Sequence, residues 1–122
     1  MLNFAPSLRI FLHAESIDMR KSFDALSGTI IKDFGKDIRQ GGLYLFINRN
    51  RDRVKLIYWD TDGIAIWMKR LEGGRFQRPP VQQDVNHVVM DASELHLLLT
   101  GIDLSSVKRR KRYVSPITME TV

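Results

Sequence analysis

Apolar side chains recur at helical spacing in the segment 19–34, where successive steps are four, three, four and four residues. This spacing places them on one face of a helix with about 3.6 residues per turn. Ser16 or Asp18 precedes the stripe as the N-cap, and Gly35 follows it where a left-handed C-cap is favoured. The pattern therefore predicts one long helix over 19–34, with a buried stripe formed by Met19, Phe23, Leu26, Ile30 and Phe34.

Apolar runs separated by turn residues predict β-strands on both sides of this helix. The run 43–47 is apolar throughout, and a short polar connection separates it from 54–59. Asp60, Thr61, Asp62 and Gly63 form the next turn, and Gly63 is expected to supply the positive φ that such a hairpin requires. The expected strands are 8–13, 43–47, 54–59, 64–71, an edge strand at 75–78 that ends before Pro79-Pro80, and 87–90.

A second helix is expected near the C-terminal end of the chain. Asp91 and Glu94 have the spacing of a capping box, with Asp91 in the cap position. The apolar residues that follow have helical spacing, and Gly101 stands near their end. The stripe of this helix consists of Leu95, Leu98, Leu99 and Ile102.

Together these elements predict an α+β fold, with an antiparallel meander sheet of four to five strands, one long helix on one face and a second C-terminal helix. We expect a single domain over residues 1–104 and a basic, flexible tail over 105–122. Both faces of the central strands are apolar, and one helix cannot cover both. Either the second helix or a partner protein covers the second face. The candidate partner-binding face, which packs on a helix or on another protein, comprises Tyr44, Phe46, Ile57, Trp59 and Trp67.

The composition of the 122 residues is that of an ordinary globular domain, with 43% hydrophobic and 27% charged residues. It excludes a disordered chain, a collagen-like chain and a disulfide scaffold. The sequence contains no cysteine, which excludes thiol catalysis and thiolate-bound metals. Its apolar runs are far shorter than the ~20 residues of a membrane span, and residues 1–9 do not resemble a secretory signal. We therefore expect a cytoplasmic protein without membrane contact.

The formal net charge of +5 is concentrated in two places. Residues 49–78 carry eight basic and four acidic side chains, and the five basic residues after them are consecutive at 108–112. In a meander, the turns at 48–53 and 72–75 share one end of the sheet, and the turn at 60–63 lies at the other. Guanidinium groups on such turns suit phosphate contacts, although a solubilising loop is the alternative. The candidate DNA-binding residues are Arg49, Arg51, Arg53, Lys55, Lys69, Arg75, Lys108, Arg109, Arg110, Lys111 and Arg112.

Enzymatic chemistry finds little support in the sequence. Asp18, Asp60 and Asp62 are the best candidates for the carboxylates of a small metal-dependent nuclease. However, Asp60 and Asp62 are ordinary turn formers, Asp18 suits a helix cap, and Asp24 can pair with Arg20 or Lys21 on the helix surface. The histidines lack zinc-type spacing, so no metal or cofactor is expected; they are His13, His87 and His96.

Four blocks of sequence carry a resemblance to a known family. The first is SIDMRKSFDAL at 16–26, and the second comprises GLYLF, NRNRDRVK and YWD within 42–60. DG, KRLE and GRF follow within 62–76, and LL and GID lie within 98–103. In order and spacing, these blocks resemble the TnpB accessory proteins, the short second reading frame of the IS66 class of bacterial insertion sequences. Thr61 stands where that family usually has glycine, and Arg78 where it has tryptophan before proline.

The resemblance implies participation in DNA transposition beside a separate, larger transposase that cuts the strands. The family has no established enzymatic activity, so we favour a non-enzymatic accessory protein. Its expected partners are DNA, either element ends or non-specific duplex, and the transposase, with a homo-oligomer as a further possibility. The alternative is a protein–protein adaptor whose arginines meet acidic patches on the transposase without touching DNA.

Overall fold

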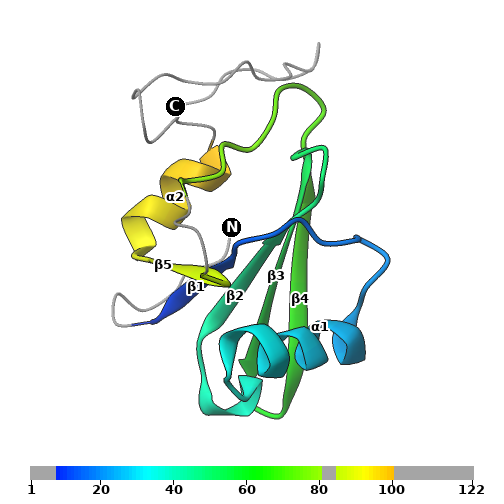
Figure 1. Cartoon of the computed structure of the whole chain (residues 1–122), viewed down its shortest axis with the longest axis vertical. Helices are drawn as coiled ribbons and strands as arrows, with labels where there is room; N and C mark the ends of the chain where they lie inside the picture. Colours follow the sequence, from blue (N-terminus) through cyan, green and yellow to red (C-terminus); the bar gives the residue numbers. More distant parts are fainter. Residues whose placement is uncertain (1–7, 81–84, 101–122) are drawn as a thin grey trace.

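A five-stranded sheet with one helix packed on each face forms the fold (Figure 1). The computed structural model describes residues 8–80 and 85–100. Its strands lie in the order β4-β3-β2-β1-β5. They are β1 (Ile10–His13), β2 (Leu43–Ile47), β3 (Arg53–Asp60), β4 (Gly63–Arg70) and β5 (His87–Met90). The helical segments are α1 (Phe23–Thr29), the π-helical η1 (Ile30–Phe34), the 3-10 helix η2 (Ile38–Gln40) and α2 (Ala92–Thr100).

The sheet is mixed, which corrects the prediction of a purely antiparallel meander. β2, β3 and β4 do form an antiparallel meander, but β1 runs parallel to β2, with Ile10 opposite Leu43. β5 then pairs antiparallel with the other side of β1. The connection between β1 and β2 is long enough to include helices and to return to the start of the sheet, which permits a parallel neighbour. The short connections between the later strands favour a meander, but they carry no information about the partner of β1.

The first helix is shorter than its apolar stripe predicts. It begins at Phe23 instead of residue 19, and its last turn is the π-helical η1. Asp18 does not cap it: the Asp18 carboxylate accepts hydrogen bonds from the backbone and side chain of Arg20. Ser22 occupies the N-cap without a side-chain bond. Gly35 ends η1 with a φ of 65°, which confirms the predicted left-handed C-cap.

The second helix begins as the sequence predicts, while Gly101 and Ile102, expected near its end, lie outside the described residues. Asp91 Oδ1 accepts from the Glu94 backbone N–H at 2.8 Å, and Glu94 Oε1 accepts from the Asp91 N–H at 3.1 Å. These reciprocal bonds form the predicted capping box and satisfy two N–H groups that the first turn would leave unpaired.

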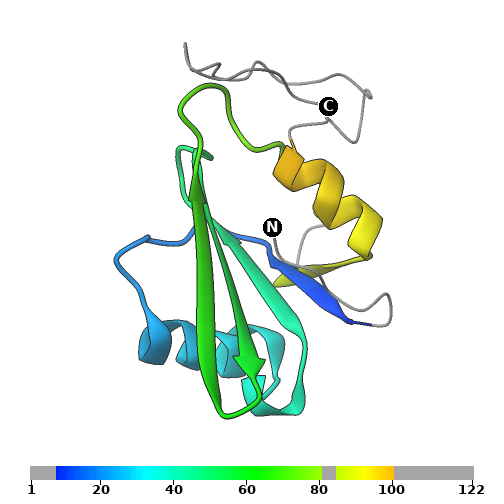
Figure 2. The ribbon, with the colours of Figure 1, turned by 180° about the vertical axis from the view of Figure 1, so that it is seen from behind.

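Two apolar layers enclose the sheet. One layer, between the sheet and α1–η1, includes Leu26, Ile30 and Phe34. The other places Leu95, Leu98 and Leu99 of α2 against the opposite face. The second helix therefore covers the second face, as the first of the two sequence-based alternatives proposed. α1 lies beside β3 and β4, whereas α2 lies towards β1 and β5, and Figure 2 shows β4 in front of α1.

Two local predictions are wrong. Residues 75–78 form no strand, because Phe76 turns into the core, where it is fully buried against the α2 layer. In the β3–β4 turn, the positive φ of 56° belongs to Thr61, and Gly63 already begins β4. Thr61 therefore stands at the position where the conformation favours the glycine of the related sequences. No helix in the described part of the chain is long and apolar enough to cross a membrane.

Candidate nucleic-acid interface

Two arginine-rich loops meet at one end of the sheet. The Leu71 N–H donates to the Asp52 carbonyl at 2.7 Å, and the Phe76 N–H donates to the Arg51 carbonyl at 2.6 Å. These bonds join the loop between β2 and β3 to the segment after β4. They confirm that the turns at 48–53 and 72–75 share one end, while the β3–β4 turn lies at the other (Figure 1). We call this region the arginine end; it carries Arg49, Arg51, Arg53, Arg70 and Arg75.

Asn48 holds the β2–β3 loop in shape. Its side-chain oxygen accepts from the backbone N–H groups of Asp52 and Arg53, both at 3.0 Å. Its amide nitrogen donates to Asp52 Oδ1 at 2.7 Å. Arg51 adopts a φ of 59°, in the left-handed region. The loop is therefore preorganised by its own polar groups, and Arg49 at its tip is exposed.

The electrostatics of the arginine end are dominated by cations. The segments 48–53 and 70–78 contain six arginines and two carboxylates. Asp52 accepts from Asn48, and Glu72 accepts from Arg70 Nε at 3.0 Å. Arg53 and Arg70 are cross-strand neighbours, and like charges placed opposite each other are unfavourable in isolation. An anionic partner would relieve this repulsion.

Two of the predicted DNA-binding lysines donate hydrogen bonds to backbone carbonyls within the fold. Lys55 is buried, and its Nζ donates to the carbonyls of Met19 and Lys21, each at 2.7 Å. Lys69 Nζ donates to the Leu99 carbonyl at 3.1 Å, near the C-terminal end of α2. A lysine reaching a helix C-terminus is favourable because the helix dipole is negative there. Neither ammonium group projects into solvent as a phosphate ligand would, so we remove both residues from the candidate site.

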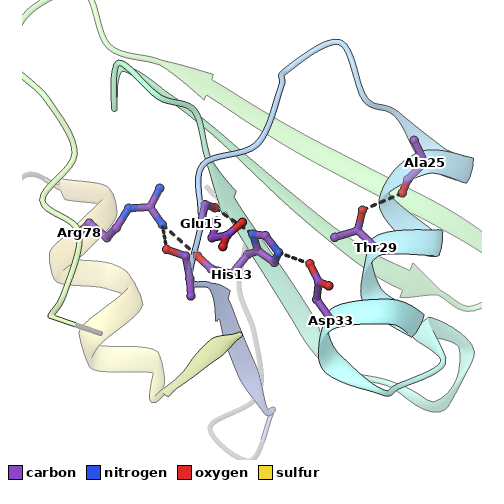
Figure 3. A network of polar contacts seen from close by, with 7 residues as sticks. His13, Glu15, Ala25, Thr29, Asp33 and Arg78 are labelled. Atoms are coloured by element: carbon purple, nitrogen blue, oxygen red, sulfur yellow. Dashed lines mark hydrogen bonds and ion pairs between the residues drawn. The ribbon is translucent and has the colours of Figure 1, made fainter. Parts of the chain in front are cut away.

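Arg78 also bonds within the fold, and its guanidinium group lies at the ends of β1 and β2. Its Nη1 donates to the carbonyls of His13 and Ala14, both at 3.0 Å (Figure 3). Its Nη2 donates to the Ile47 carbonyl at 3.3 Å. The guanidinium group thus ties the segment after β4 to the ends of β1 and β2. Burial, and secondarily the charge of Arg51, lower the pKa of Arg78. This position, where the resemblance leads one to expect tryptophan, is held by hydrogen bonds instead of an aromatic contact.

A buried histidine forms a contact that sequence reasoning missed. His13 Nε2 lies 2.7 Å from Asp33 Oδ2, and His13 Nδ1 donates to the Glu15 carbonyl at 2.8 Å (Figure 3). The pair joins the end of β1 to η1. With both ring nitrogens engaged, His13 has no nitrogen left to bind a metal or to accept a proton from a substrate. Nothing in the separation of 20 residues signals this pair.

The carboxylates considered for a nuclease do not form a centre. Within residues 8–80 and 85–100, no three His, Cys, Asp or Glu side chains gather as metal ligands. Asp18 pairs with Arg20 at 2.6 Å, and this hydrogen-bonded pair lowers the pKa of Asp18 to about 2. Arg20 therefore pairs with Asp18 and not with Asp24. Asp60 ends β3 and Asp62 lies within the exposed β3–β4 turn.

The predicted partner-binding face is largely internal. Tyr44, Phe46 and Ile57 are fully buried against α1 and η1, and Trp59 packs at the margin of the same layer. Trp67 lies opposite Leu56 in the register and belongs to the other layer. The five residues therefore do not form one exposed surface. The second candidate DNA-binding segment, 108–112, and the domain boundary at 104 lie outside the described residues.

Comparison with known proteins identifies the family. A family model described as "IS66 Orf2 like protein" matches residues 8–109. The chain belongs to the IS66 Orf2-like family. This IS66 Orf2-like protein is 32% identical over 110 residues to "Uncharacterized protein y4jC" of Sinorhizobium fredii, covering 90% of this chain and 92% of the relative. It is 28% identical over 103 residues to "Uncharacterized protein y4hO" of the same organism, covering 84% and 88%.

The family associates this IS66 Orf2-like protein with the transposition of insertion sequences. The match spans both loops of the arginine end. No solved structure matches the chain.

Proposed function

We propose that this IS66 Orf2-like protein is a non-enzymatic accessory protein of transposition that binds the phosphate backbone of DNA through the arginine end. The observation that carries the proposal is the joining of two basic loops, far apart in sequence, by the Leu71–Asp52 and Phe76–Arg51 backbone hydrogen bonds. Transposition supplies the polyanion: the ends of the element are DNA, and an accessory protein acts where the transposase meets them.

The chemistry of the arginine end suits phosphates better than bases. Guanidinium groups form bidentate contacts with phosphate oxygens, and such contacts position a protein without reading sequence. Sequence is read mainly by a helix or a β-ribbon inserted into the major groove. The arginine end consists of loops and strand ends, and α1 lies towards the opposite end of the β3–β4 ribbon (Figure 1). We therefore expect affinity for duplex DNA with little discrimination between sequences.

The test is titration of labelled element-end DNA and of unrelated duplex over a range of salt concentrations. If each arginine of the arginine end contacts one phosphate, log K falls with log[salt] at a slope of about −4.5. Replacing Arg49, Arg53 and Arg75 together with alanine is expected to make the slope shallower by roughly 3 and to weaken binding at low salt. Arg51 is left unchanged because its main chain, with a φ of 59° and a carbonyl that accepts from the Phe76 N–H, joins the two loops.

A charge-matched control separates site binding from general attraction. Lys21, Lys32 and Arg39 are exposed and lie on or beside the helical segments between β1 and β2. Their triple alanine variant loses the same formal charge and should keep most of the affinity and the slope. Equal loss in both variants would contradict a localised site. Absence of duplex binding by the unmodified protein at low salt would favour the adaptor function, in which the arginines meet acidic patches on the transposase.

A further inference from the structure

β4 is an edge strand whose outer side is unpaired within the described chain. In the strand order β4-β3-β2-β1-β5, it bonds only to β3. The Asn48 N–H donates to the Arg53 carbonyl, so the main-chain groups of Arg53 face β2. These directions alternate along a strand, so every odd-numbered residue of β3 turns its main-chain N–H and C=O groups towards β2. The main-chain groups of the β4 residues opposite them therefore point away from the sheet; these residues are Ile64, Ile66, Met68 and Arg70.

The middle of β4 carries no charge that would protect this edge; Lys69 and Arg70 lie at one end of the strand. Five consecutive residues, from 64 to 68, are uncharged and apolar, whereas exposed edges are commonly blocked by an inward-pointing charge, a proline or a bulge. Every residue of β4 is at least partly exposed, while all five of β2 are buried. Met68, on the same face as Ile64 and Ile66, is 55% exposed.

We propose that the edge of β4 is a self-association surface, on which a second copy of this chain pairs antiparallel through its own β4. A two-fold axis at Ile66 places Ile64 of each copy opposite Met68 of the other. The outward-facing main-chain groups of both strands then bond to each other, and the two sheets become one. Such an interface is isologous, because the same residues are used on both sides.

Charge complementarity supports a second copy as the occupant. In this register Arg70 of each copy lies opposite Asp62 of the other. Arg70 and Asp62 are both exposed, at opposite ends of the β3–β4 hairpin. An antiparallel pair therefore brings the cationic end of one copy to the acidic turn of the other, twice. Opposite charges at facing positions fix the register and the orientation.

The position of α1 supports the same pairing. Its first turn projects past β4, beyond the edge of the sheet, at the end near the β3–β4 turn (Figures 1 and 2). That turn begins with Phe23, which is 47% exposed. The two-fold axis would carry this overhang over the part of the partner copy's β4 that includes Met68. Two exposed apolar side chains on different elements would then cover each other.

The experiment is sedimentation equilibrium of the full chain over a concentration series. Met68→Lys and Asp62→Arg are each expected to weaken self-association by about tenfold or more. The pairing would bury the new ammonium group of Met68→Lys, and the new guanidinium group of Asp62→Arg would face Arg70 of the other copy. The matched control is Val89→Lys, which places the same charge on the opposite edge strand, β5, where Val89 is 62% exposed. This variant should associate as the unmodified protein does.

A charge swap makes the test independent of folding defects. Asp62→Arg combined with Arg70→Asp restores opposite charges across the proposed pair and should recover association lost in Asp62→Arg. A protein that stays monomeric at the highest concentration, or that loses association in Val89→Lys but not in Met68→Lys, would overturn the proposal. In the first case, a strand of another protein is the remaining candidate occupant. Arg70 belongs to both surfaces, so the charge swap is judged by sedimentation alone; Met68→Lys lies outside the arginine end and tests this inference without affecting the duplex titration.

Discussion

Thr61 adopts a backbone conformation that disfavours its own side chain. Its φ is 56°, a region in which β-branched residues are rare because the side chain crowds the neighbouring carbonyl. The two-residue turn between β3 and β4 imposes this conformation. The strain belongs to one residue, so it is open to relief by one substitution.

We predict that Thr61→Gly raises the free energy of unfolding by about 1 kcal/mol, as measured by urea denaturation. Glycine removes the steric conflict, although part of the gain is lost to the greater entropy of the unfolded chain. The matched control is Gly63→Ala in the same turn. Gly63 does not have a positive φ, and an added Cβ would meet no atom within 4 Å, so its effect should be small. A destabilised Thr61→Gly variant would contradict the assignment of strain.

His87 is the second residue whose environment predicts a measurable effect. Its ring packs edge-on against Phe11 and tilted against Phe34. Its Nδ1 is buried and has no hydrogen-bond partner among the described residues. Burial, followed by the charges of Lys36 and His13, lowers the pKa of His87. The folded protein therefore resists protonation at this site more than the unfolded chain does.

We predict that part of the stability is lost when the pH falls below about 6.5, the ordinary pKa of histidine. The unfolded chain takes up a proton at His87 there while the folded protein does not, so unfolding is favoured until the folded state is protonated as well. Urea denaturation across this range should show a smaller loss for His87→Phe, which keeps the ring packing. His87→Gln should also show a smaller loss of unfolding free energy over this pH range. An unchanged pH dependence in both variants would exclude His87 as its source.

At the scale of elements, Lys55 links β3 to the segment that leads into α1. Its ammonium group donates to the carbonyls of Met19 and Lys21, just before the helix, and so fixes the segment that leads into α1. α1 begins after this segment, at Phe23.

We predict that Lys55→Met lowers the free energy of unfolding by roughly 1–3 kcal/mol, since it removes two charge-assisted hydrogen bonds to partly buried carbonyls while it keeps the aliphatic packing. The salt slope of duplex binding should be unchanged in the folded variant, because Lys55 is not part of the arginine end. Arg49→Ala is the contrasting variant: it should affect binding and leave stability within about 0.5 kcal/mol. Loss of slope in Lys55→Met would return this residue to the interface.

The elements differ in how well local patterns predict them. β2, β3, β4 and α2 follow from apolar runs, a short turn and a capping box, which are interactions between neighbours in sequence. The start of α1 and the fate of residues 75–78 depend on distant groups. Lys55 bonds to the carbonyls of residues 19 and 21, which precede the helix, and Phe76 occupies a core position beneath α2.

At the scale of the whole molecule, the meeting of the two basic loops follows from the alternation of hairpin ends. Once β2, β3 and β4 form a meander, the turns at 48–53 and 72–75 must share one end. This placement needed no knowledge of the rest of the fold. Deciding which cations belong to the arginine end did require the rest of the fold. Lys55, Lys69 and Arg78 carry the same charge as their neighbours but donate to backbone carbonyls.

The amino-acid sequence by itself determined the α+β class, most strand positions, the capped second helix and the end of the sheet at which arginines gather. These features depend on periodicity, turn chemistry and chain connectivity, which act over a few residues. Only the tertiary structure decided the parallel pairing of β1 with β2, the division of cations between surface and interior, and the His13–Asp33 contact. Each of these depends on which groups become neighbours after burial, and burial is a property of the whole chain.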